Sequence, residues 1–190
     1  MKKTSAITYL VSGDENIRPC DKVLKRTARR VRYDTEVSHN AQDELKPSRR
    51  FVVVAHGRRD GTVMWFRSDE GAAAPWLWIG MRKPPKGAHI YLYSCHARKI
   101  ARHLRHCMCF GHGGVVPMPT GAKNDVVLAY LDQVDRVMRE QSYGVAEWRA
   151  ALNAYVDQAW VSEAEDPTEG DHEKALTLHI LRKSLGNPND

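Results

Sequence analysis

A histidine and a cysteine, 39 residues apart, each follow an apolar run typical of a buried strand. His56 comes directly after residues 51–55, and Cys95 comes directly after residues 89–94. If these runs are neighbouring parallel strands, both side chains reach the carboxyl edge of the sheet, where open α/β folds place their sites. A thiolate can attack a carbonyl carbon, and an imidazole can protonate the leaving amine. The pair therefore predicts hydrolysis of an amide bond, with no metal or organic cofactor.

Backbone groups beside this pair have the features that oxyanion stabilisation needs. Gly57 carries no Cβ, so a substrate can approach its backbone closely. The N–H groups of Gly57 and Cys95 are the predicted oxyanion donors. Cys95 also precedes a predicted helix and lies within residues 71–124, which contain eight Lys or Arg and no Asp or Glu. Both features favour the thiolate form of Cys95.

The residues around this pair resemble the caspase-like cysteine peptidases, most closely the CHAT and separase branch and small stand-alone prokaryotic members. The resemblance rests on VVVAHG at residues 52–57, followed by IYLYSCHA at residues 90–97 and by a short segment opening with glycine at residues 113–116. It spans residues 5–135 by the order of elements. It implies an endopeptidase that acts on protein substrates through a Cys95–His56 dyad, as a prokaryotic effector that a protein partner activates. The caspase pentapeptide is absent, so cleavage after aspartate is not implied.

Two acidic residues are candidates for the substrate pocket. Asp14 follows the first predicted strand, and Asp125 opens the predicted helix after residues 113–118. In the CHAT and separase-like members, an Asp that opens this helix selects a basic residue, so the resemblance implies cleavage after Arg or Lys. Asp125 can equally be an acid that interacts with its own helix dipole, and Asp14 can be a turn residue. Arg18, in the same loop as Asp14, would instead favour an acidic substrate residue.

Two other interpretations remain open. One is a zinc site, because residues 95–112 hold seven potential ligands and His103 and Cys107 would share a face of a predicted helix, although the spacing matches no familiar finger. The seven are Cys95, His96, His103, His106, Cys107, Cys109 and His112. The other is an inert caspase-like scaffold that binds an acidic partner or nucleic acid through residues 71–124. No nucleic-acid motif is recognisable, which makes nucleic acid the weaker partner.

The elements that must position these residues alternate between strands and helices. Strands are predicted over residues 5–12, 51–55, 62–67, 76–81, 89–94 and 113–118, and helices over 20–31, 97–108, 125–140, 145–160 and 171–185. This alternation predicts an α/β fold with a mostly parallel central sheet. The resemblance refines it to a caspase-like α/β/α sandwich. Residues 1–190 form one predicted domain, with residues 145–190 as its helical C-terminal extension.

Composition excludes several classes of protein. The chain has 190 residues, of which 42% are hydrophobic and 27% charged, enough for one domain with a buried core. No apolar run reaches the ~18–20 residues of a membrane span, and no secretory signal is recognisable. Four cysteines are too few for a disulfide scaffold of this size. The sequence therefore predicts a cytoplasmic protein without a membrane partner.

Overall fold

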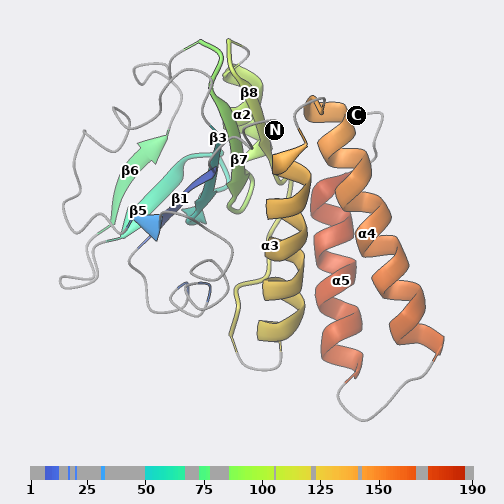
Figure 1. Ribbon diagram of the computed structural model, residues 1–190. Coiled ribbons are helices and arrows are strands. Elements are labelled where there is room, and N and C mark those ends of the chain that lie inside the picture. The colour runs from blue at the N-terminus through green and yellow to red at the C-terminus, as the bar shows by residue number, and fades with distance from the viewer. Residues whose placement is uncertain are drawn as a thin grey trace.

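The computed structural model describes residues 7–12, 17, 20, 31–32, 50–66, 73–77, 86–104, 106–120, 123–140, 143–165 and 171–186 (Figure 1). At its centre lies a parallel sheet with the strand order β2-β1-β3-β7-β8. Its strands are β1 (Ile7–Val11), β2 (Val31–Arg32), β3 (Arg50–Val54), β7 (His89–Tyr93) and β8 (Met108–Gly111).

The middle strands β3 and β7 are the two apolar runs that precede His56 and Cys95. Every residue of β3 is buried, as expected of a parallel strand that is covered on both faces. The register pairs Val54 with Tyr93, so the two strands end side by side. The prediction that they are parallel neighbours is confirmed.

A small antiparallel sheet branches off after β3. It consists of β4 (His56–Gly57), β5 (Val63–Phe66) and β6 (Ala73–Leu77), in that order. Only Ala55 separates β3 from β4, so the chain leaves the central sheet immediately before His56. The predicted strand over residues 62–67 is β5, while β6 begins three residues earlier than the predicted start at residue 76.

Different elements cover the two faces of the central sheet. On one face, alternate strand residues such as Val52 and Tyr91 pack against α3 (Asn124–Arg139), α4 (Val145–Glu165) and α5 (Asp171–Leu185). These three helices lie side by side in Figure 1. On the other face, Val53 and Leu92 pack with the short helix α2 (Arg98–His103). The fold is thus α/β, with a parallel sheet and C-terminal helices. None of the described helices has both the length and the apolar character needed to cross a membrane.

The segment after Cys95 differs from its prediction. The helix predicted over residues 97–108 ends at His103, and Met108–Gly111 forms β8 instead. Within β8, Cys109 and Phe110 belong to the clusters on opposite faces of the sheet, which is the period-two pattern of a strand. Residues 113–118 are not a strand; Pro117 within them has no N–H to donate to a ladder. Of the predicted helix over residues 20–31, residues 21–30 lie outside the described residues, and Val31 belongs to β2.

Candidate active site

Gly57 allows β4, the segment that follows β3, to pack closely against Ser94 and Cys95, the residues that follow β7. The Ala55 N–H donates to the carbonyl of Tyr93 over 3.2 Å, so the strands stay paired up to the point where β4 begins. A Cβ on Gly57 would lie only 2.0 Å from the carbonyl oxygen of Cys95 and 2.6 Å from Oγ of Ser94. Only glycine therefore fits at position 57. The structure places the backbone beside His56 directly against the backbone of Cys95. The sequence predicts a different reason for this glycine, the close approach of a substrate.

Both members of the predicted dyad are half-buried, so each remains accessible from solvent. The Cys95 thiol lies against the segment that follows β8. The Val116 N–H donates to its Sγ over 3.4 Å, and the sulfur lies 4.0 Å from the Val116 carbonyl oxygen. An N–H directed at sulfur stabilises negative charge there. This contact gives Cys95 a donor that its sequence neighbours do not supply.

His96, directly after Cys95, has an unusual backbone conformation. Its φ is 55°, and it is the one non-glycine residue in the described part of the chain with a positive φ. Such a conformation costs about 1–2 kcal/mol for a residue with a Cβ. The His96 N–H donates to the Gly114 carbonyl over 2.7 Å, which holds the turn in place. Strained residues gather at functional sites, so His96 favours a functional Cys95 over an inert core thiol.

Ser94 is the small residue that precedes the predicted nucleophile. Its side chain is fully buried, and its hydroxyl has no hydrogen-bond partner among the residues that the structure describes. Because this hydroxyl lies beside Gly57, a larger side chain at position 94 would push β4 away from Cys95. The close packing of β4 against Cys95 thus requires both a short side chain at position 94 and a glycine at position 57.

The two candidate substrate acids have different outcomes. Asp14, like Arg18, lies outside the described residues. Asp125 is exposed in the first turn of α3, where a carboxylate interacts favourably with the helix dipole. Its predicted position at the start of this helix is confirmed, and its role in binding substrate stays a prediction.

The seven potential metal ligands do not converge. Within the described ranges, no group of three or more His, Cys, Asp or Glu is placed to hold a metal ion. The Cys107 thiol donates to the Leu104 carbonyl over 3.1 Å, beyond the end of α2. His103 and Cys107 therefore do not share a helix face, because the helix stops at His103.

His112 belongs to a buried polar network instead of a metal site. Burial, assisted by the charge of Arg98, lowers the pKa of His112 to about 3, so its ring is neutral. Its Nε2 lies 2.6 Å from the Tyr91 hydroxyl and its Nδ1 2.7 Å from the Ser184 hydroxyl. The Tyr91 and Tyr130 hydroxyls are 2.7 Å apart, and burial raises the pKa of both tyrosines, which keeps them protonated.

The network joins β7, the end of β8, α3 and α5, and sequence analysis did not find it. The available signal was weak. Tyr91 lies within an apolar strand and Ser184 lies within α5. The sequence around each residue does not indicate that its side chain would hydrogen-bond to His112.

No protein-family model, no curated protein and no solved structure matches this chain. The functional interpretation therefore depends on the arrangement of His56, Gly57 and Cys95.

Proposed function

We propose that this protein is a caspase-like cysteine endopeptidase in which Cys95 is the nucleophile and His56 its acid–base partner. The observation that carries the proposal is the packing of Gly57 against the Cys95 backbone at the ends of two adjacent parallel strands. The order of the parallel strands and the helices on both faces of the sheet support the caspase-like sandwich.

The reaction follows from the two side chains. His56 accepts the thiol proton, and the Cys95 thiolate attacks the carbonyl carbon of the scissile peptide bond. The N–H groups of Gly57 and Cys95 stabilise the resulting oxyanion. The C–N bond breaks as His56 returns the proton to the leaving amine. Water, deprotonated by His56, then hydrolyses the thioester and regenerates the thiol.

The expected cellular setting is the cytoplasm, with a protein partner that switches on cleavage. The substrate is a protein, and the proposed reaction requires no cofactor.

Thiol alkylation tests the proposal before any substrate is known. Cys20, Cys107 and Cys109 are buried, whereas Cys95 is half-buried. A brief iodoacetamide pulse at neutral pH should label Cys95 at least about tenfold faster than the other three, because an activated thiolate reacts fastest. Mass spectrometry of the digested protein gives the four rates.

The His56→Ala variant separates activation from mere accessibility. Cys95 remains accessible in this variant but loses its base, so its labelling rate should fall. His103→Ala, which removes an exposed histidine at the end of α2, should leave the rate unchanged. Labelling of Cys95 at the rate of the buried thiols, or at one rate with and without His56, contradicts the dyad.

We further propose that cleavage follows Arg or Lys, with Asp125 pairing with the substrate cation. A peptide-library digest should therefore show cuts after basic residues. Asp125→Asn should lower kcat/KM for basic substrates by about 10- to 100-fold, as expected for the loss of a charge-assisted hydrogen bond. Asp132→Asn is the matched control, because Asp132 lies on the same helix and is paired with Arg136. Cuts after Asp or Glu would overturn the proposal and favour Arg18.

A second candidate function is an inert scaffold that binds an acidic partner or nucleic acid. Exposed basic residues beside the dyad favour it. Arg58 and Arg59 follow β4, and Lys99 and Arg102 lie on α2. The Lys99 ammonium donates to the Arg59 carbonyl, so these two basic segments lie side by side. Binding of a polyanion by a protein in which Cys95 reacts no faster than the buried thiols would support the scaffold.

A further inference from the structure

The end of α5 contacts the segment that follows β8. The Gly113 N–H donates to the Ser184 carbonyl over 2.7 Å. The Ser184 hydroxyl donates to the Leu181 carbonyl over 2.8 Å, which leaves its oxygen to accept the proton on Nδ1 of His112. Because His112 is neutral, its Nε2 is then the acceptor for the Tyr91 hydroxyl. Ser184 thus holds residues 112–113 through both its backbone and its side chain.

The same segment holds Cys95 and its neighbours. The Gly114 carbonyl accepts from the strained His96, and the His112 carbonyl accepts the Arg98 N–H over 2.8 Å. Two residues further on, the Val116 N–H points at the Cys95 sulfur. Residues 112–116 therefore lie between α5 and the nucleophile, and they are hydrogen-bonded to both.

Arg98 makes a second connection between the nucleophile segment and α5. Its guanidinium donates to the Leu185 carbonyl. A Cβ on Gly113 would lie 3.2 Å from the Arg98 Cζ, and a Cβ on Gly186, whose φ is +72°, would lie 2.5 Å from Nη2. Both glycines therefore make room for this guanidinium.

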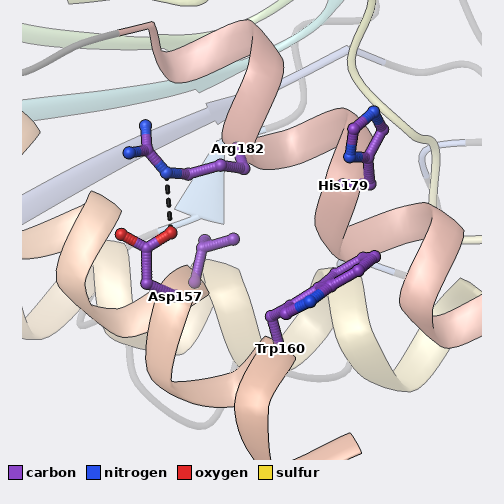
Figure 2. Close-up of a pocket in the computed structure, with 5 residues that line it drawn as sticks. Asp157, Trp160, His179 and Arg182 are labelled. Carbon is purple, nitrogen blue, oxygen red and sulfur yellow. Dashed lines mark hydrogen bonds and ion pairs between the residues drawn. The ribbon is translucent and has the colours of Figure 1, made fainter. Parts of the chain in front are cut away.

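The carbonyl of Gly186 is fixed in turn by α4 and α5. It accepts from Asn153 Nδ2 over 3.0 Å and from Arg182 Nη1 over 3.2 Å. Arg182 is itself held by an ion pair with Asp157 on α4, in which its Nε lies 2.7 Å from a carboxylate oxygen (Figure 2). These hydrogen bonds fix the C-terminal end of α5 next to the Leu185 carbonyl that accepts from Arg98.

We propose that Ser184 and Arg98 are positioning residues for Cys95, acting through residues 112–116 and through the start of α2. The two C-terminal helices are then part of the active-site construction. This inference rests on the proposed peptidase function. Its effect on the reactivity of the Cys95 thiol can nevertheless be measured without a substrate.

The variants Ser184→Ala and Arg98→Ala test this role through the alkylation rate of Cys95. Each should slow labelling of Cys95 by about three- to tenfold, because a loosened segment no longer holds the Val116 N–H on the sulfur. Arg98→Lys, which keeps a cation but not the guanidinium fork, should recover part of the rate. Lys183→Ala is the matched control, since Lys183 is exposed on the same turn of α5.

The buried thiols separate positioning from loss of structure. Cys20, Cys107 and Cys109 should stay unlabelled in all variants; if they become labelled together with Cys95, the role is merely structural and the inference is overturned. An unchanged Cys95 rate in both alanine variants also overturns it. On a peptide substrate, kcat should fall while KM holds. If Cys95 of the unaltered protein is alkylated no faster than the buried thiols, the peptidase proposal fails. The positioning role is still decided by the alkylation rate of Cys95 in each variant relative to that in the unaltered protein.

Discussion

Cys95→Ala and His56→Ala should each reduce peptide hydrolysis by about four to six orders of magnitude, because a nucleophile and its acid–base partner act as one unit. Combining both changes should add little to either alone, since the second removes a group that already has no partner. The measurement is kcat/KM on the peptides that the library digest identifies.

The remaining thiols provide the controls for this result. Cys107→Ala and Cys109→Ala alter buried positions on the opposite side of the fold from the C-terminal helices, and both should retain most of the activity if they remain folded. Circular dichroism must show that all variants keep the fold. Full activity in Cys95→Ala would refute the mechanism outright.

Gly57→Ala should damage both stability and activity. Its new Cβ would lie only 2.0 Å from the carbonyl oxygen of Cys95, so β4 and the Cys95 backbone must move apart. Overpacking of this kind costs about 1–3 kcal/mol of unfolding free energy, and a displacement of ~1 Å at the site can cost about 100-fold in rate. Urea denaturation and kcat/KM measure the two effects.

Gly114→Ala is the matched control for this substitution. Gly114 is also half-buried beside the site, but a Cβ there meets nothing nearer than 3.8 Å, the distance of an ordinary contact. Its unfolding free energy should change by less than about 1 kcal/mol. If Gly57→Ala lost no more unfolding free energy than Gly114→Ala and kept the kcat/KM of the unaltered protein, the close approach of Gly57 to Cys95 would matter for neither stability nor function.

The central strands could be predicted because their composition leaves few alternatives. Residues 51–55 and 89–94 are continuous apolar runs, and a strand buried on both faces is the structure that such short runs fit best. Their parallel pairing in register is what the structure confirms, and the juxtaposition of the His56 and Cys95 side chains at one sheet edge stays a prediction from general topology. The helices over residues 125–140 and 145–160 were similarly predictable, since their apolar residues recur at helical spacing. The helix over residues 171–185 was predictable from Asp171 as its cap and Gly186 as its stop.

The helix that begins after Ala97 was predicted, but the segment from Leu104 to Met118 could not be assigned correctly from local pattern. Its short apolar stretches fit a strand as well as a helix, and the choice depends on the neighbouring β7, with which β8 pairs. The contribution of α5 was equally hidden, because Ser184 is an unremarkable residue in a helix until the fold brings it to His112. Long-range hydrogen bonds leave no periodicity in a sequence.

The hydrogen-bonded connection from Cys95 through residues 112–116 to α5 also has a consequence for folding during translation. Ser184 is translated about 90 residues after Cys95, which at about 5–20 residues per second is a delay of about 5–18 seconds. During that interval the emerging chain carries its nucleophile without the helix that holds the nucleophile segment. On the proposed mechanism, a newly made molecule would therefore acquire a fully reactive thiol only after α5 has emerged and docked, and it would not cleave neighbouring nascent chains before then.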